Sequence, residues 1–418
     1  MNLKDLREMD GSLREVMNRN QAKYKLQLNS ILYLPRNKGG RGIRNLETAY
    51  KQLKIKSAIR LVQEKEPRMQ IVNNFERNRI RKEKSSVYKD AIAFAEHDFD
   101  SELMMLEDNF IFKYRKEEEE LTTQDVECVK RILKEVNLKK LKKESEVASW
   151  QGVMLRNREG DDELIREECF SWLSKWKDCP TKMINNLHSI YLQTVPTLSF
   201  QNYRMPTGNN NSTCRLCKEG NETVKHILSN CKYFLNTAYI RRHDKTLQHI
   251  LFKFLTKKQF ISRCPPWYSN VNIKPIYDND EATITWDIPE YTGYESNEDI
   301  RPPRPDGKIV MHKERKIYVL ENSIPWVENR STKYEEKEDK YRRIVQSLKV
   351  DYPQHEVKQL TFIMDCLGGF SICLKQSIKQ LGFDDKECMN IIYGMQKVVL
   401  AEASSIMDRF KIMTFTRD

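Results

Sequence analysis

The spacing of apolar and polar residues predicts that the first part of the chain is helical. A helix is predicted at residues 3–17, and an apolar run follows at 26–34. Charged amphipathic segments then continue over 51–145, where apolar residues recur at helical intervals between runs of lysine and glutamate. Residues 157–162 are rich in polar residues and are expected to form a loop at a domain boundary.

The last part of the chain has a different pattern, in which short apolar runs alternate with longer amphipathic segments. The short runs predict strands at 283–288, 308–312, 317–320 and 357–364. The longer segments predict helices starting near 332 and covering 370–381 and 384–413. Strand, hairpin, helix, strand and helices in this order indicate an α/β core, with a mixed sheet covered by helices.

Two carboxylates flank the predicted hairpin. Asp306 stands just before the strand at 308–312, and Glu321 stands just after the strand at 317–320. Because the turn at 313–316 is short, the outer ends of both strands meet, and the two side chains are expected to face one another. Like charges repel unless a cation lies between them, so the pair predicts a hard divalent ion such as Mg²⁺.

The helix that starts near residue 332 adds a lysine to this picture. Helical spacing from Tyr334 to Tyr341 places Lys337 on the inward side, and Lys340 lies on the neighbouring edge. A buried ammonium is costly unless it meets a carboxylate, a phosphate or water. The alternative is a solvated helix on which the lysine stem lies along the surface. The pattern alone does not decide between them.

Four potential zinc ligands follow in the order Cys214, Cys217, His226 and Cys231, with gaps of two, eight and four residues. Two thiols on one turn, with a histidine and a third thiol from a following helix, complete a tetrahedral shell without a spare position. The spacing therefore favours a structural zinc ion over unligated thiols. The later histidines, His243 and His249, are expected to be ordinary surface or packing residues.

Residues 35–43 form a glycine-rich loop that carries Arg36, Lys38 and Arg41. Glycines interleaved with cations can cradle a phosphate through exposed amides and positive charge. From the residues alone, a flexible turn is the preferred interpretation.

Composition narrows the choice of partners. The chain has 418 residues, of which 32% are charged, and a net charge of +12, which favours an anionic polymer as partner. It has no apolar run long enough to cross a membrane and no signal-peptide core. Ten scattered cysteines without a secretion signal indicate reduced thiols and metal binding rather than a disulfide framework.

These motifs together resemble the C-terminal part of site-specific non-long-terminal-repeat (non-LTR) retrotransposon polyproteins. Arg304-Pro305-Asp306, Glu321 and the sequence from Lys337 to Tyr341 resemble their restriction-like endonuclease, a PD-(D/E)xK nuclease. Ser323 stands where many such nucleases have a lysine, which is typical of the branch whose lysine is displaced onto the next helix. The cysteine–histidine motif, with the sequence RRHDK after it, resembles the CCHC motif before that endonuclease. Residues 32–55 resemble the thumb after the polymerase.

The resemblance implies a thumb-like region at 1–150, a helical linker at 151–213, a zinc motif with its helix at 214–262 and an endonuclease domain at 270–418. The catalytic residues implied are Asp306, Glu321, Lys337 and Lys340. Mg²⁺ would be bound by Asp306 and Glu321, and the zinc ion would have a structural role. The nucleic-acid contacts implied are Arg36, Lys38, Arg41, Arg304 and Tyr341.

The implied function is nicking of target DNA to prime reverse transcription. DNA and the element's RNA would be partners, and the location would be nuclear or at least soluble and intracellular. The sequence has no polymerase palm, so we do not expect it to be a reverse transcriptase by itself. Two other interpretations stay open. One is a catalytically inert, zinc-containing nucleic-acid-binding remnant, and the other is an interaction protein of charged helices.

Overall fold

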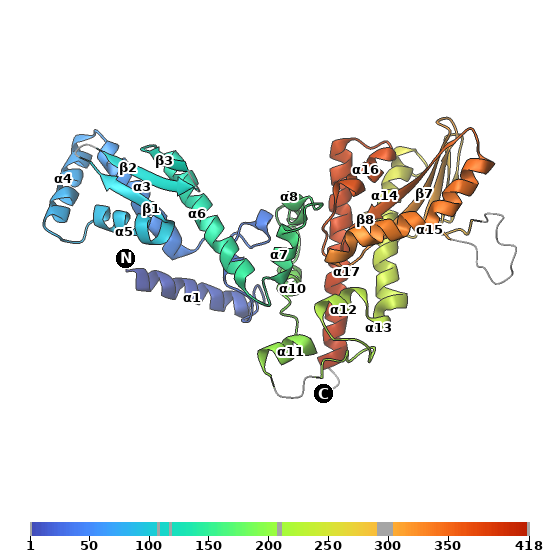
Figure 1. Cartoon of the computed structure of the whole chain (residues 1–418), viewed down its shortest axis with the longest axis horizontal. Coiled ribbons are helices and arrows are strands. Elements are labelled where there is room, and N and C mark those ends of the chain that lie inside the picture. The colour runs from blue at the N-terminus through green and yellow to red at the C-terminus, as the bar shows by residue number, and fades with distance from the viewer. Residues whose placement is uncertain (1, 107–108, 117–118, 207–210, 291–303, 416–418) are drawn as a thin grey trace. The chain divides into compact units, whose positions relative to one another are not determined.

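A computed structural model describes residues 2–106, 109–116, 119–206, 211–290 and 304–415. The chain divides into two compact units, Met1–Val153 and Met154–Asp418 (Figure 1). Both combine helices with a small sheet, so the chain is a mixed helix-and-sheet protein. None of the helices in the described part of the chain is long and apolar enough to cross a membrane.

The first unit packs helices against a three-stranded antiparallel sheet in the order β1-β2-β3. Its helices are α1 (Leu3–Arg19), α2 (Ser30–Tyr33), the 3₁₀ turn η1 (Arg36–Lys38), α3 (Leu46–Gln63), α4 (Pro67–Arg81), α5 (Val87–Phe99) and α6 (Val126–Val147). Its strands are β1 (Ser101–Met105), β2 (Phe110–Lys116) and β3 (Glu119–Thr123).

The sheet of the first unit corrects the sequence prediction, which expected helices throughout 51–145. Phe110, Phe112 and Tyr114 of β2 are buried at every second position and join the core formed by α3, α5 and α6. This period of two is the signature of a half-buried strand. The lysines and glutamates around it gave the segment the composition of a solvated helix, and that composition concealed the alternation.

The second unit is built on a five-stranded sheet in the order β4-β5-β6-β7-β8. The strands are β4 (Ile276–Asp278), β5 (Ala282–Trp286), β6 (Gly307–Met311), β7 (Lys316–Ser323) and β8 (Glu356–Ile363). The first four pair antiparallel, and β8 pairs parallel with β7 after a crossover through α15 (Arg330–Asp351). The predicted strand order, hairpin and crossover helix are confirmed, while the short β4 was not predicted.

The remaining elements of the second unit are mostly short helices before the zinc motif and longer ones after it. They are α7 (Val153–Glu159), α8 (Arg166–Cys169), α9 (Trp172–Lys175), α10 (Thr181–Tyr191), α11 (Leu198–Arg204), α12 (Val224–Ser229), α13 (Lys232–Phe234), the π-helical turn η2 (Leu235–Tyr239), α14 (Ile240–Lys257), the 3₁₀ turn η3 (Val327–Asn329), α16 (Ile372–Gln380) and α17 (Asp385–Phe415). The loop predicted at 157–162 begins only after α7, since residues up to Glu159 are helical.

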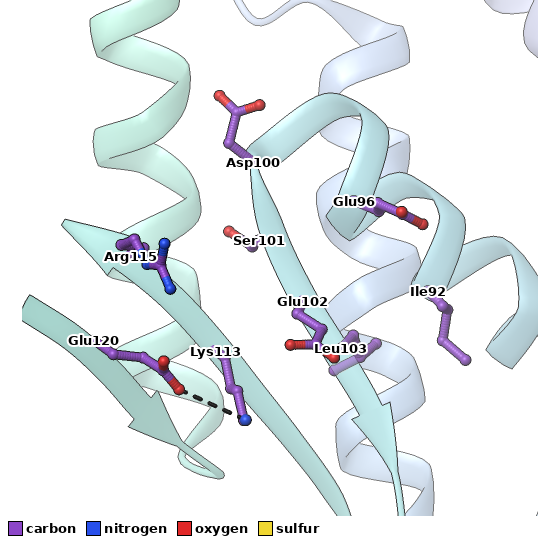
Figure 2. A pocket seen from close by; sticks show the side chains of 9 residues that line it. All are labelled: Ile92, Glu96, Asp100, Ser101, Glu102, Leu103, Lys113, Arg115 and Glu120. Carbon is purple, nitrogen blue, oxygen red and sulfur yellow. Dashed lines mark ion pairs between the residues drawn. The ribbon is translucent and has the colours of Figure 1, made fainter. Parts of the chain in front are cut away.

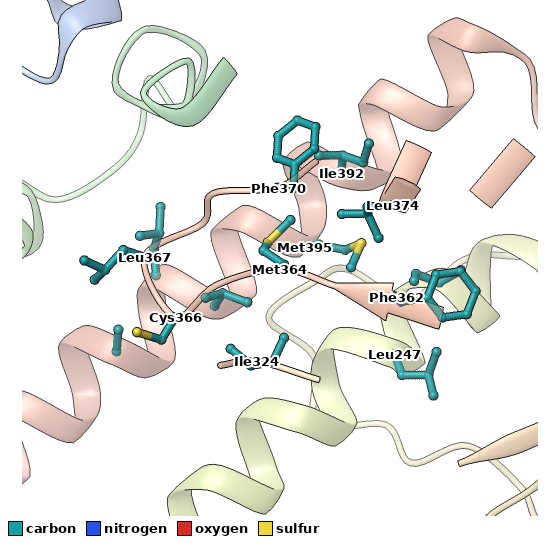
Figure 3. Close-up of a cluster of buried hydrophobic side chains, with 14 of the residues drawn as sticks. Leu247, Ile324, Phe362, Met364, Cys366, Leu367, Phe370, Leu374, Ile392 and Met395 are labelled. Atoms are coloured by element: carbon teal, nitrogen blue, oxygen red, sulfur yellow. The ribbon is translucent and has the colours of Figure 1, made fainter. Parts of the chain in front are cut away.

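Helices cover both faces of the five-stranded sheet. On one face, Tyr341, Ile344 and Leu348 of α15 pack on alternate residues of β7 and on Val357 of β8. On the other face, Phe362 and its neighbours join a large core with α14 and α17 (Figure 3). The alternation along β7 therefore decides which side chains reach α15 and which reach α14.

A buried ion network fixes the loop that follows β8. Asp365 is fully buried and accepts hydrogen bonds from Arg158 (3.1 Å) and Arg330 (2.6 Å). It also accepts bonds from the amides of Leu367 and Gly369. Arg158 and Asp365 are 207 residues apart in sequence, so the network connects the start of the second unit to the end of its sheet.

Candidate functional site

Antiparallel register brings the two predicted carboxylates together. Gly307 lies opposite Leu320, so Asp306 and Glu321 are the next opposed positions at the same end of β6 and β7. The backbone N–H of Asn322 donates to Oδ2 of Asp306 at 2.7 Å. Directly opposed residues share a face of the sheet, and this face is the one that α15 covers.

Glu321 is the most enclosed member of this group, with 1% of its surface exposed. Oε1 accepts a hydrogen bond from the ammonium of Lys337, while Oε2 is buried without a hydrogen-bond partner among the described residues. Burial raises the pKa of Glu321, the charge of Asp306 raises it further, and Lys337 opposes both. We call Asp306, Glu321 and Lys337 the acid–lysine cluster.

Lys340, Tyr341 and Arg304 lie next to the acid–lysine cluster. The ammonium of Lys340 donates to the Tyr341 hydroxyl at 2.7 Å, and that hydroxyl donates to the backbone carbonyl of Arg304 at 3.0 Å. The Arg304 side chain instead forms an ion pair with Asp287 at 2.6 Å. These contacts hold the chain just before Asp306 in place.

His243, near the start of α14, completes the surroundings of Asp306. Its Nε2 lies 3.1 Å from Asp306 Oδ2 and 3.1 Å from the carbonyl oxygen of Asn322, and its Nδ1 lies 2.9 Å from Asp244. Although burial lowers the pKa of His243, the bonds to Asp244 and Asp306 outweigh it and raise the pKa to about 10. The expectation of an ordinary surface or packing histidine is therefore wrong for His243.

His249 does fill a packing position, as expected. It is buried, and a Cβ placed on Gly394 would lie 1.8 Å from its Nε2, so the ring occupies the space that the glycine leaves. Burial, together with the charges of Lys253 and Lys397, lowers the pKa of His249 to about 4. Its imidazole is therefore neutral near pH 7.

The four predicted zinc ligands converge on one point, where their donor atoms all lie within 4.8 Å of one another. Cys214 and Cys231 approach to 3.9 Å through their sulfur atoms, and Cys217 Sγ lies 3.2 Å from His226 Nε2. His226 lies in α12, whose first turn is capped by the Thr223 side chain. Three thiols and an imidazole are the donor set that zinc prefers, so this cluster could hold a zinc ion.

The thiol pKa values and the hydrogen bonds around the four zinc ligands favour binding of a cation. The nearby Cys231 thiol lowers the pKa of Cys214 to about 5, while the pKa of Cys231 itself is raised. One thiol of the pair is thus readily deprotonated, which metal binding requires. The turn is held by Glu222, which is fully buried and accepts bonds from the side chain and amide of Arg215.

The glycine-rich loop of the first unit does not expose its amides. The N–H groups of Arg41, Gly42 and Ile43 donate to carbonyls of residues 31, 34 and 32 at 2.8–2.9 Å. Those of residues 38–40 donate within the loop. The expectation of exposed amides that cradle a phosphate is therefore wrong for residues 38–43, because the loop folds back on the apolar run before it.

A groove of about 870 Å³ adjoins this loop between α3 and α6, and five cations line it. They are Arg36, Arg44, Lys56, Lys130 and Lys134. Of the three loop cations predicted to contact nucleic acid, only Arg36 lines the groove. Arg41 instead donates to the carbonyl of Ala22 at 2.7 Å.

A second hollow of the first unit, about 600 Å³ in volume, lies over β1 and β2 (Figure 2). Its charged lining is mostly acidic, and Lys113 pairs with Glu120 at 3.6 Å. The acidic residues are Glu96, Asp100, Glu102 and Glu120. Carboxylates that outnumber the cations do not favour a polyanion here, so we assign this hollow no role in binding nucleic acid.

No protein-family model matches the chain, and no curated protein matches it. The resemblance to retrotransposon endonucleases therefore rests on the sequence motifs alone.

Proposed function

We propose that the second unit is a divalent-metal-dependent DNA endonuclease of the PD-(D/E)xK class, similar to the restriction-like endonuclease of site-specific non-LTR retrotransposons. The observation that carries this proposal is the acid–lysine cluster. Glu321 is buried opposite a second carboxylate, with one oxygen unpartnered and the other bound to Lys337. A buried carboxylate that faces a second carboxylate and keeps an unpartnered oxygen is typical of a metal-dependent site.

The residues present fit a hard divalent cation. Asp306 and Glu321 offer carboxylate oxygens on one face of the sheet, and the unpartnered Oε2 of Glu321 is available as a ligand. A bound Mg²⁺ would polarise the scissile phosphate and neutralise its developing charge. Lys337 would orient the attacking water or stabilise the negative charge that forms on the phosphate.

His243 and Asn322 would hold Asp306 in position from the side opposite α15. Asp306 Oδ2 already accepts the Asn322 N–H and contacts His243 Nε2, so its orientation is fixed before substrate binds. Preorganised ligands of this kind reduce the reorganisation needed during the reaction. In this proposal, zinc at the Cys/His cluster has a structural role, because its four ligands leave no open position.

The biological role that follows is the nicking of nuclear DNA to leave a 3′ hydroxyl that can prime reverse transcription. The basic groove of the first unit would then contact the DNA or the element's RNA. The net charge of +12 supports either polyanion as partner.

The test is nicking of supercoiled plasmid by the full chain with Mg²⁺. We expect Asp306→Ala to abolish nicking and Lys337→Met to reduce it by roughly 10²- to 10³-fold, since one charge-stabilising group is removed. Lys349→Ala is the matched control, because Lys349 is exposed on the same helix about three turns away. Circular dichroism establishes that each variant is folded.

The outcomes separate the competing functions. Equal nicking by all variants would remove the assignment of Asp306 and Lys337. If the parent protein binds DNA in a salt-sensitive manner but does not cleave it, the result would favour the catalytically inert nucleic-acid-binding module.

A further inference from the structure

A cavity of about 610 Å³ lies in the second unit, and none of its lining residues belongs to the acid–lysine cluster or the zinc ligands. Its walls come from α9, α14, α17 and the loop at 264–267. The volume lies within the range of about 300–1,000 Å³ that is usual for small-molecule and cofactor sites. The lysines and aromatic rings that line the cavity indicate the chemistry of its ligand.

Three lysines give the cavity a positive charge. Lys253 and Lys397 form no ion pair with a carboxylate among the residues that the structure describes. Lys175 is held by Glu168 at 3.4 Å and lies over the Tyr393 ring at 3.6 Å. Two lysines without an acidic partner in the lining of one cavity favour an anionic ligand.

Aromatic rings form another part of the wall. Trp267 is half-buried and packs edge-on against Trp176, with ring centroids 5.2 Å apart. It is therefore held in place by packing. A fixed indole beside lysines is the combination on which proteins stack the bases of unpaired nucleic-acid strands.

The cavity is a formed feature of the fold. Gly394 lies in the interior of α17, where glycine costs about 1 kcal/mol relative to alanine. Its missing side chain admits the buried ring of His249, and both residues line the cavity. Since the imidazole is neutral, the positive charge of the lining comes from the lysines.

We propose that this cavity binds a nucleotide unit of single-stranded nucleic acid, with the phosphate held by Lys253 and Lys397 and the base stacked against Trp267. A duplex keeps its bases stacked inside the helix, so it cannot stack one of them on Trp267 without unpairing it. A free nucleotide shares the same chemistry, and the experiment below distinguishes it from a strand. This site is independent of the proposed nuclease centre.

The test measures binding of the full chain to a fluorescent oligothymidylate of about 16 nucleotides, by anisotropy and without added Mg²⁺. We expect Lys253→Ala/Lys397→Ala to weaken binding and to reduce the slope of log K against log salt by about 0.7, because one phosphate is no longer neutralised. Trp267→Ala should weaken binding roughly five- to hundredfold, while Trp267→Phe retains most of the affinity.

Lys257→Ala is the matched control, because Lys257 is on the same helix and pairs with Glu387 at 2.7 Å. Its affinity should equal that of the parent protein. An unchanged salt slope in the double lysine variant, or equal losses for single-stranded and duplex DNA, would overturn the proposal. A mononucleotide that binds as tightly as the oligomer would overturn the assignment to a strand. Because no cleavage is measured, the result is independent of nuclease activity.

Discussion

Replacing Asp365 tests whether the buried ion network holds the second unit together. Asp365 is fully buried and accepts bonds from Arg158 and Arg330, whose side chains are 4% and 6% exposed. Asp365→Ala would leave Arg158 without its carboxylate partner, and Arg330 would retain Asp161 as a carboxylate partner and the Val327 carbonyl as an acceptor. Two backbone amides, those of Leu367 and Gly369, would also lose their acceptor.

The magnitude follows from these contacts. Breaking a buried ion pair by removing one partner costs about 3–5 kcal/mol. Each buried amide left without an acceptor adds about 1–3 kcal/mol. The sum, about 5–11 kcal/mol, equals most or all of the stability of an ordinary domain. We therefore expect Asp365→Ala to unfold the second unit, and Asp365→Asn, which keeps an acceptor but loses the charge, to cost about 3–5 kcal/mol.

Urea unfolding followed by tryptophan fluorescence is a suitable assay, because all tryptophans except Trp150 lie in the second unit. Asp161→Asn is the matched control, since it also pairs with Arg330 but is more exposed, and its cost should be at most about 1 kcal/mol. Equal losses for Asp365→Asn and Asp161→Asn would refute the reasoning.

Three further predictions concern the zinc cluster, Gly394 and His249. Cys231→Ser should abolish zinc binding, measured by mass spectrometry, and lower the melting temperature. Cys128→Ser is the control and should retain the zinc. Zinc retained in both variants would contradict the assignment of the site. Gly394→Ala should destabilise the second unit in urea unfolding, because the added Cβ would lie 1.8 Å from Nε2 of His249. Gly11→Ala in α1 is the control and should stabilise the first unit by up to about 1 kcal/mol. A stabilising effect of Gly394→Ala would refute the contact with His249. The pKa of His249 is about 4 in the folded protein and near 6.5 in the unfolded chain, so the unfolded chain takes up the proton first as the pH falls. About 3 kcal/mol of the free energy of unfolding, fully present above pH 6.5, should therefore be lost as the pH falls toward 4. His249→Gln should show a weaker pH dependence in that window, and an unchanged one would exclude this cause.

Local pattern was sufficient to predict the hairpin and most of the cluster on it. Alternation located the two strands, antiparallel pairing then required Asp306 to oppose Glu321, and helical spacing placed Lys337 on the inward side. Each of these steps uses a period or a turn, which a sequence displays directly.

The parts that could not be predicted depend on contacts between distant residues. His243 precedes Asp306 by 63 residues, and nothing in its own neighbourhood indicates that the start of α14 lies beside the end of β7. The sequence around Asp365 likewise predicts only the end of a strand, because its partner Arg158 lies 207 residues away. The sheet β1–β3 was missed because its charged composition concealed the alternation of β2.

Contacts of this kind also link the Cys/His cluster to the acid–lysine cluster. The Tyr239 hydroxyl accepts the N–H of Cys231 at 3.1 Å and donates to the carbonyl of Ile227 at 2.7 Å, so it fixes the ligand segment to the start of α14. Only four residues later, His243 contacts Asp306. A short segment of rigid helix thus separates the metal-binding turn from a carboxylate of the cluster. Zinc bound there would stabilise the position of His243 and, through it, the orientation of Asp306.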